Sequence, residues 1–334
     1  MKMRRLIAMV MVAVLCLAMT ACGGSKEEGS AAKDGELKEV TLVLDYVPNT
    51  NHTGFYVAQE KGYFEEQGLK VNIIEPGDND STTLCAAEKA EFAITYQENV
   101  TYARTAEEPM PIRAIATIIQ HNTSGFISAA EDNIKSPKDF EGKVYAGWQA
   151  PSEEAVLKAV MKAADADFSK LTMVGATGAG IEAMGDDIDL QWEFEGWAVI
   201  NDRMNGHDVA YMPVNELDER LDYYTPVLIT NETMINEDPE TVKAFTAAVK
   251  KGYEFAIENP EEASEILLEV IPDTDPEFLL ESQKFLSEQY SKDSDTWGVM
   301  KDEVWDNYTE FMHEYELISE TIPASEQYTN EFIQ

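Results

Sequence analysis

Short runs of apolar, β-branched residues alternate with stretches of helical spacing along most of this chain, and the alternation restricts the folds that it can adopt. Residues 40–44 (VTLVL) predict a buried strand. Residues 55–62 have helical spacing, and residues 70–74 predict a second strand. A strand, a helix and another strand in this order are typical of an open, mostly parallel α/β sheet.

The same pattern continues towards the C-terminus. Further strands are expected at residues 91–95, 112–119, 143–147, 171–174, 188–192 and 225–230. Helices are expected at residues 84–89, 100–106, 136–140 and 152–164, the last with Ser152 as its N-cap. From residue 238 onwards the spacing is helical, and Pro239, Pro260 and Pro276 each suit the first position of a helix.

This order of elements predicts an α/β protein of two lobes with a helical C-terminal part. The chain is expected to cross between the lobes near residues 120–130 and 215–228. The first lobe would then comprise residues 38–125 and 226–334, and the second lobe residues 126–225. Ligands in such folds bind at the C-terminal ends of strands and, in two-lobed forms, between the lobes.

The charge balance argues against one class of partner. The chain has 63 acidic and 25 basic residues among 334, a formal net charge of −38. Affinity for nucleic acid comes from Lys and Arg contacts with phosphates, so a chain this negative is not expected to bind a polyanion. A small anionic ligand would need a local cation, for which Arg104 is the candidate near the predicted strand ends.

The N-terminus has the pattern of an export signal. Three basic residues precede an apolar run at residues 6–19, which is long enough for a signal-peptide core and too short to span a membrane. Residues 19–22 (MTAC) resemble the lipobox of bacterial lipoproteins, which implies that Cys22 is acylated and becomes the mature N-terminus. We therefore expect a signal peptide at residues 1–21 and a flexible tether at residues 22–37. The alternative is ordinary secretory cleavage beside an incidental cysteine.

Metal and cofactor chemistry find little support in the sequence. Apart from Cys22 the cysteines are Cys16, inside the apolar leader, and Cys85, which is expected to be a small buried residue. None of the four histidines has a partner at helical spacing, so a metal site is not expected. The glycines of residues 175–180 do not match a dinucleotide fingerprint, and no cofactor is predicted.

Aromatic and amide side chains gather where five predicted strands end. The segments are residues 45–54, 96–99, 121–125, 147–151 and 192–197. Aromatic faces supply stacking, whereas amides and carboxylates match ring nitrogens and an exocyclic amine. These side chains suit a cleft for a small, flat, hydrogen-bonding ring.

Several segments also resemble one family: DYVPNTNHTGFYVAQEKGYFEEQGL, YQENVTYAR, IIQHNTSGF, KSPKDFEGKVYAGW, DIDLQWEFEGW and DYYTPVLIT. Together they are similar to the solute-binding lipoproteins of ABC importers for thiamine pyrimidine precursors, over essentially all of residues 38–334. The resemblance implies a two-lobed periplasmic-binding-protein fold of type II that closes on hydroxymethylpyrimidine or formylaminopyrimidine. It further implies an extracytoplasmic, membrane-anchored monomer that delivers its ligand to the permease and ATPase subunits of an importer.

The same superfamily includes fungal pyrimidine-precursor synthases, which use a cysteine-rich motif, iron and pyridoxal phosphate. This chain has no cysteine cluster, and Gln97 and Glu98 rather than a lysine follow the third strand. We therefore expect a binding protein and not an enzyme. An exported enzyme acting on a pyrimidine stays open as an alternative, as does a binder of a riboflavin-like, sulfonate or nitrate ligand.

The candidate ligand-binding residues come from these strand ends: Tyr46, Asn51, His52, Tyr96, Glu98, Asn122, Thr123, Trp148, Trp192, Glu193 and Glu195. Tyr46, Trp148 and Trp192 are candidates for stacking, although an aromatic side chain beside a strand is more often part of the core. Asn51 and His52 lie where a loop enters the first helix, and His52 is more simply a hydrogen-bonding loop residue than a base.

Glu195 is the expected anchor for a ring nitrogen, and Glu193 is a weaker candidate for that role. The alternative for Glu195 is an exposed loop acid. Replacing Glu195 by Gln is expected to weaken binding more than replacing Glu98. Asn122 and Thr123 lie at the first predicted crossing, where they either bind the ligand or organise the hinge.

Overall fold

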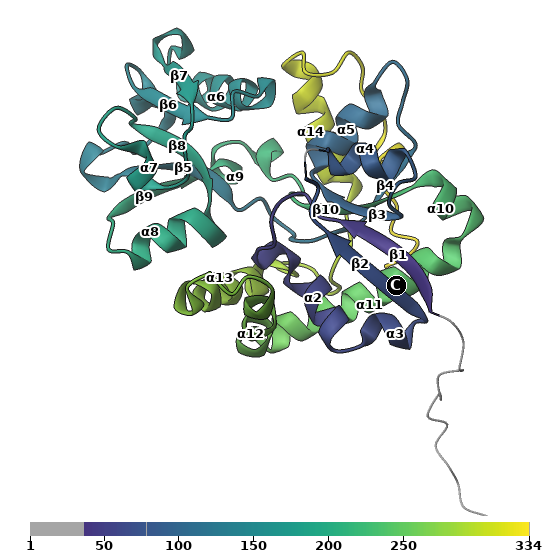
Figure 1. Ribbon diagram of the computed structural model, residues 1–334. Helices are drawn as coiled ribbons and strands as arrows, with labels where there is room; N and C mark the ends of the chain where they lie inside the picture. Colours follow the sequence, from purple (N-terminus) through teal and green to yellow (C-terminus); the bar gives the residue numbers. More distant parts are fainter. Residues whose placement is uncertain (1–36, 78, 334) are drawn as a thin grey trace, which may run out of the picture. The chain divides into compact units, whose positions relative to one another are not determined.

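The computed structural model describes residues 37–77 and 79–333 and contains two five-stranded mixed sheets flanked by helices (Figure 1). The expected signal peptide, the lipidation site Cys22 and all of the expected tether except residue 37 lie outside the described residues. None of the helices in the described part is both long enough and apolar enough to cross a membrane.

The first sheet has the strand order β2–β1–β3–β10–β4. Its strands are β1 (Lys38–Val43), β2 (Leu69–Ile74), β3 (Phe92–Thr95), β4 (Ile112–Thr117) and β10 (Val227–Asn231). β1 runs parallel to β2 and β3, whereas β10 is antiparallel to both of its neighbours. Phe92 of this sheet stacks on Phe245 with ring centroids 3.7 Å apart, at the centre of the largest hydrophobic cluster.

The second sheet repeats this arrangement in the order β7–β6–β8–β5–β9. Its strands are β5 (Ser124–Ala129), β6 (Val144–Gly147), β7 (Thr172–Gly175), β8 (Leu190–Phe194) and β9 (Val209–Pro213). β6 is parallel to β7 and β8, and β5 is antiparallel to β8 and β9. Each sheet therefore has one strand that runs against the rest, and that strand follows directly after the chain has crossed from the other sheet.

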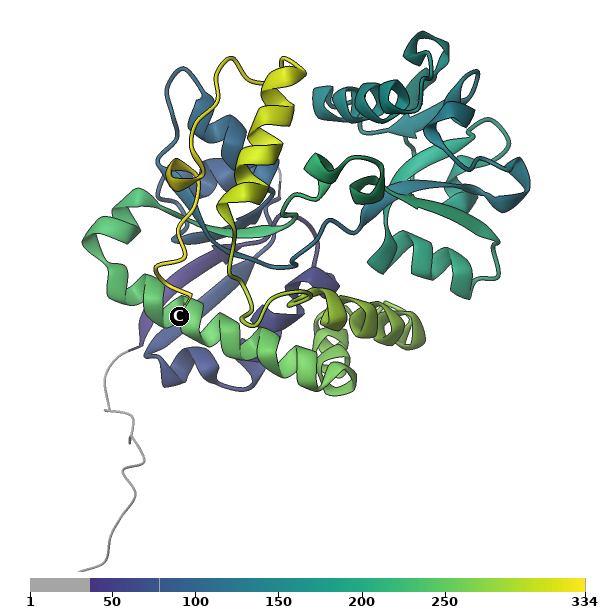
Figure 2. The same ribbon diagram turned by 180° about the vertical axis from the view of Figure 1, so that it is seen from behind.

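Helices flank both sheets. The segments flanking the first sheet are η1 (Thr50–His52), α2 (Thr53–Glu60), α3 (Tyr63–Glu66), α4 (Ser81–Ala86), α5 (Gln97–Thr105), α10 (Glu232–Glu237), α11 (Pro239–Glu258), α12 (Pro260–Val270) and α13 (Pro276–Gln289). α11 runs along the first sheet (Figure 2) and contacts α2. The predicted proline starts of α11, α12 and α13 are confirmed.

A shorter set of helices belongs to the second sheet: α6 (Pro151–Ala163), α7 (Ile181–Met184), α8 (Ile200–Met204), α9 (Val214–Leu217) and the π-helix η5 (Glu195–Val199). The remaining short 3-10 segments are η2 (Ala130–Asp132), η3 (Pro137–Phe140), η4 (Phe168–Lys170), η6 (Glu219–Leu221) and η7 (Ala324–Glu326).

The helix α14 (Asp302–Glu314) packs on both halves. Trp305 belongs to a hydrophobic cluster of the first sheet, whereas Tyr308 and Phe311 belong to the cluster of the second sheet. Consecutive turns of one C-terminal helix thus contribute to two separate cores.

Several details differ from the sequence predictions. Strands β5 and β9 were not predicted. Ser152 is not the N-cap of α6, because Pro151 with its fixed φ already occupies the first turn and Ala150 takes the cap position. The first turn is capped by the Glu153 carboxylate, which accepts hydrogen bonds from the backbone N–H groups of Trp148 and Ala150.

Candidate ligand-binding site

Polar side chains meet where β1 and β3 end. Asp45 follows β1, and its Oδ1 lies 2.7 Å from Nε2 of His52, a fully buried residue. Nδ1 of His52 accepts a hydrogen bond from the backbone N–H of Asn49, so the ring is fixed from both sides. Burial alone would raise the pKa of the Asp45 carboxyl. The attraction to His52 and the hydrogen bonds from His52 and Tyr96 outweigh burial, so the pKa of Asp45 lies below its usual value. The loop after β1 is therefore locked around a paired carboxylate.

Glu98, in the first turn of α5, joins this group. Its Oε2 accepts a hydrogen bond from the Tyr308 hydroxyl at 3.2 Å, and Ser152 on α6 lies near enough to favour the ionised carboxylate. Burial raises the pKa of Glu98 and outweighs these two contacts, which lower it. The ring of Tyr223 stacks on Tyr308 with centroids 4.0 Å apart. Residues from both sheets thus surround Glu98.

A second group consists of aromatic rings at the ends of β6 and β8. Trp148 lies 5.8 Å from Trp192 and 6.4 Å from Phe194, measured between ring centroids. Trp192 is buried, whereas Trp148 is 59% exposed. Nε1 of Trp192 is buried and has no hydrogen-bond partner in the described part of the chain. Trp148 and Phe194 therefore offer aromatic surface at the strand ends, as a stacking site needs.

The first crossing lies beside a pocket of about 290 Å³. Asn122, Thr123 and Glu195 line it together with His121 and residues of α13. Burial raises the pKa of Glu195, although Arg203, whose Nη1 lies 3.7 Å from Oε1, opposes the shift. The expected anchor carboxylate therefore already has a basic partner.

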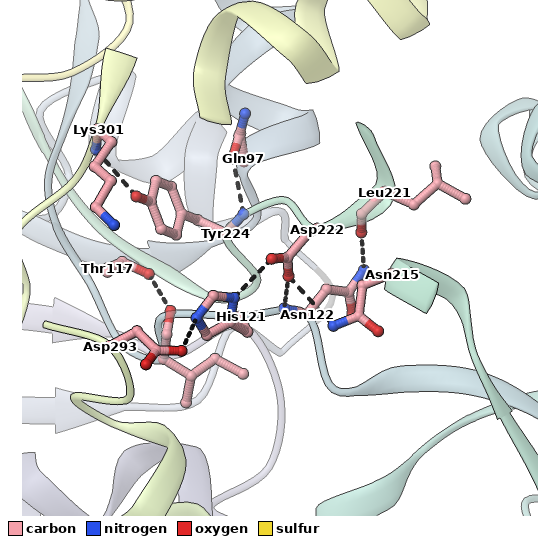
Figure 3. Close-up of polar contacts among 11 residues, drawn as sticks. Gln97, Thr117, His121, Asn122, Asn215, Leu221, Asp222, Tyr224, Asp293 and Lys301 are labelled. Carbon is pink, nitrogen blue, oxygen red and sulfur yellow. Dashed lines mark hydrogen bonds and ion pairs between the residues drawn. The ribbon is translucent and has the colours of Figure 1, made fainter. Parts of the chain in front are cut away.

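Asp222 ties the two crossings together (Figure 3). Its Oδ2 lies 2.6 Å from Nδ1 of His121, and its Oδ1 accepts from the backbone N–H of Asn122 at 2.9 Å. The Asn122 side chain donates to the carbonyl of Leu221 and accepts from Ser124. Nε2 of His121 also lies 3.4 Å from a carboxylate oxygen of Asp293. The Asn122 amide is thus used to organise the crossing.

The remaining candidates include Tyr46 and Asn51, in the segment that leads to His52, and Thr123, which lines the pocket with Asn122 and Glu195. Tyr46 is 64% exposed. The backbone carbonyl of Asn51 accepts from Tyr253, while Thr123 accepts through its carbonyl from the Tyr211 hydroxyl and the Glu195 N–H.

Glu193 lies on the face of β8 opposite to Trp192, because side chains alternate along a strand. It accepts from the Gly180 N–H at 3.3 Å, and burial raises its pKa to about 7. Glu193 therefore does not share a site with the two tryptophans.

The structure brings together His52, Tyr96 and Glu98, separately Trp148 with Trp192, and at the pocket Asn122, Thr123 and Glu195. The participants that were not among the candidates include Asp45, Ser152, Phe194, Tyr223 and Tyr308. Asp45 directly follows a predicted strand and Tyr223 precedes one, so their positions beside strand ends could have identified both as candidates. Tyr308 lies on a C-terminal helix whose spacing indicates only a buried face. In the described ranges, no three His, Cys, Asp or Glu side chains form a group that could hold a metal ion.

Two mixed sheets joined by two crossings, with polar and aromatic side chains at the strand ends, define a periplasmic-binding-protein fold. The solved structure of the aliphatic sulphonate binding protein SsuA from Escherichia coli has this fold, with a TM-score of 0.66 at 11% identity, covering 87% of this chain and 91% of that one. The chain belongs to the NMT1/THI5-like family, whose model matches residues 49–263.

Several curated relatives cover most of the chain, among them two that are named for pyrimidines. A formylaminopyrimidine-binding protein from Halalkalibacterium halodurans is 28% identical over 96% of this chain and 97% of its own length. A 4-amino-5-hydroxymethyl-2-methylpyrimidine phosphate synthase from Legionella pneumophila is 24% identical over 88% of this chain and 92% of its own length. The expected fold class and family resemblance are confirmed, and the family includes proteins named as binders and proteins named as synthases.

Proposed function

We propose that this chain is the extracytoplasmic substrate-binding component of an ABC importer and that it captures hydroxymethylpyrimidine or formylaminopyrimidine. The observation that carries the proposal is the meeting at Glu98 of residues from both halves of the fold: Glu98 follows β3, and Tyr308, which donates to it, belongs with Tyr223 to the hydrophobic cluster of the second sheet. A ligand held there touches both halves of the fold. The name of the Halalkalibacterium relative supports the choice of a pyrimidine.

The proposed mechanism is closure of the two halves about the crossings at His121 and Asp222. A planar ring stacks on exposed aromatic surface such as Trp148, and its amine and ring nitrogens pair with carboxylates of the strand ends. Closure requires that the ligand bind the closed form more tightly than the open form. The permease and ATPase subunits of the importer are the proposed partners of this monomer, which acts without a cofactor.

An exported enzyme is the second candidate, since several relatives are named as synthases. The binding role is favoured because the formylaminopyrimidine-binding relative matches the chain at higher identity and over more of its length. Mass analysis of a pyrimidine after incubation with the protein separates the two functions. A binder returns its ligand unchanged, whereas an altered mass contradicts the proposal.

An anionic ligand is disfavoured by the strand-end charges. Arg104, the candidate cation, pairs with Glu232 at 3.1 Å and donates to the carbonyl of Met110. It is therefore occupied by a structural contact. Sulfonate and nitrate ligands would meet Asp45 and Glu98 without a free cation between them.

Direct titration tests the ligand. The chain without residues 1–22 retains every described residue and is expected to bind one aminopyrimidine per molecule in isothermal titration calorimetry. Riboflavin and an alkanesulfonate serve as comparison ligands. Heat with either of these and none with any thiamine-pathway pyrimidine would replace the ligand assignment while keeping the class of protein.

Anchoring through Cys22 has its own test. The proposed location is the outer side of the cell membrane, with residues 22–37 as the tether. Cells expressing the full chain are expected to incorporate labelled palmitate into it, and Cys22→Ser is expected to abolish the label. Labelling of the variant at the wild-type level would refute the anchor.

A further inference from the structure

Glu98 lacks the basic partner that three other carboxylates near the strand ends have. Asp45 pairs with His52, Asp222 with His121, and Glu195 lies near Arg203. Across residues 37–77 and 79–333, Glu98 forms no ion pair, and its side-chain hydrogen bond comes from the Tyr308 hydroxyl.

The groups that face Glu98 cannot supply a positive charge. They are Tyr96 at the end of β3, Tyr102 on α5, Ser152 and Glu153 on α6, Tyr223 before β10, and Tyr308 on α14. Burial and the nearby Glu98 carboxylate raise the pKa of Tyr102 to about 12, and the pKa values of the other three tyrosines are raised as well. Glu153 is itself acidic. The surroundings therefore consist of neutral hydroxyls, aromatic rings and a second acid.

Glu98 nevertheless has free acceptor capacity. A carboxylate can accept about four hydrogen bonds, and the Tyr308 hydroxyl uses one of these positions. A largely buried carboxylate without a counter-charge is costly, and a proton or a cationic ligand removes that cost. The Tyr308 ring that donates to Glu98 is itself stacked on Tyr223 and Phe311, which fixes the position of the hydroxyl that holds the carboxylate.

We infer that Glu98 binds the amidine edge of a planar aminoheterocycle, a ring nitrogen next to an exocyclic amine, and that binding takes up one proton from solvent. The proton is shared between the ring nitrogen and one carboxylate oxygen, while the amine donates to the other oxygen. No covalent bond changes, and the proton returns to solvent when the ligand leaves. The inference deepens the proposed pyrimidine-binding function and rests on it.

Calorimetry in two buffers measures the proton directly. The probe is 4-amino-5-hydroxymethyl-2-methylpyrimidine, titrated at pH 7.5 in phosphate and in Tris, whose ionisation enthalpies differ. For the wild-type chain the enthalpy difference is expected to correspond to about one proton per ligand. Glu98→Gln preserves shape and is expected to abolish the uptake and weaken affinity about tenfold or more. The matched control is Glu107→Gln, an exposed acid just after α5, which is expected to change neither.

The outcomes separate the role of Glu98 from the proposed pyrimidine-binding function. Binding by the wild-type chain without proton uptake overturns the role of Glu98 and leaves the proposed function standing, whereas no binding of any pyrimidine removes both. Proton uptake that persists in the Glu98→Gln variant also overturns the role of Glu98. If that variant fails to fold by circular dichroism, the wild-type affinity between pH 6.5 and 8.5 decides: a fall of about tenfold per pH unit supports the inference, and a flat profile refutes it.

Discussion

Gly54 on α2 provides a stringent test of how the loop carrying His52 is positioned. A Cβ atom at Gly54 would lie 2.3–2.5 Å from three ring atoms of Tyr253, about 1 Å closer than ordinary contact at 3.4 Å. Tyr253 cannot easily move, because it is fully buried, stacks on Trp297 at 4.3 Å and donates its hydroxyl to the carbonyl of Asn51. Replacing Gly54 by Ala therefore forces α2 away from α11.

The expected magnitude combines two opposing effects. Overpacking of a core costs about 1–3 kcal/mol, and a contact this short lies at the upper end or above it. Ala gains about 1 kcal/mol over Gly in a helix interior. We expect the free energy of unfolding to fall by about 2 kcal/mol in Gly54→Ala and pyrimidine affinity to fall with it, since Asn51 and His52 shift with the helix.

Urea denaturation followed by circular dichroism measures the free energy of unfolding, and calorimetry measures the pyrimidine affinity. The control is Gly175→Ala at the end of β7, where the added Cβ meets only the side chain of Gln149. It is expected to change the free energy of unfolding by less than about 0.5 kcal/mol. An unchanged or more stable Gly54→Ala protein would refute the account of the α2–α11 contact.

Three further predictions follow from the described contacts. The hydrogen bond to Asp222 raises the pKa of His121, so its stabilising contribution is complete below about pH 6.5 and is lost as pH rises through the raised pKa. The urea midpoint is expected to decline over that range, and a His121→Asn protein with the same decline would disprove this cause. Burial raises the pKa of Glu193 from 4.5 to about 7, so its ionisation destabilises the fold by on the order of 3 kcal/mol above pH 7. Glu193→Gln is expected to raise the free energy of unfolding at pH 8 and not at pH 4; equal effects at both pH values would contradict it. A Cβ at Gly196 would lie 2.2 Å from Leu286 of α13, so Gly196→Val is expected to weaken pyrimidine affinity by separating α13 from the π-helix, and unaltered affinity in calorimetry would show that this contact is not needed.

The sequence predicts most strands because their β-branched runs carry a local signal. The predicted segments 70–74, 91–95 and 143–147 each overlap the observed strand to within one residue at either end. β5 and β9 lack that signal: β5 begins with Ser124 and Gly125 at a crossing, and β9 is only half-buried and ends in a proline. Their place in the sheet comes from pairing with distant strands, which local periodicity does not report.

The site was predictable where position along a strand determines it. His52, Tyr96 and Glu98 follow strand ends that lie side by side in one sheet, so the rule for parallel strands brings them together. Glu193 was ranked as a ligand residue because the predicted strand ended at residue 192; the observed strand continues to Phe194, and its alternation turns Glu193 away from Trp192. Tyr308 reaches Glu98 from 210 positions further along the chain, a contact that no local pattern contains.

The strand order of the first sheet has a consequence for how the protein is made. β10 lies between β3 and β4, so β4 gains its strand neighbour only when residues 227–231 have left the ribosome or the export channel. By then the whole second sheet has already emerged. The early segments must therefore wait with an unsatisfied edge, which exposes them to misassociation and makes chaperone protection during synthesis or secretion most valuable before β10 emerges.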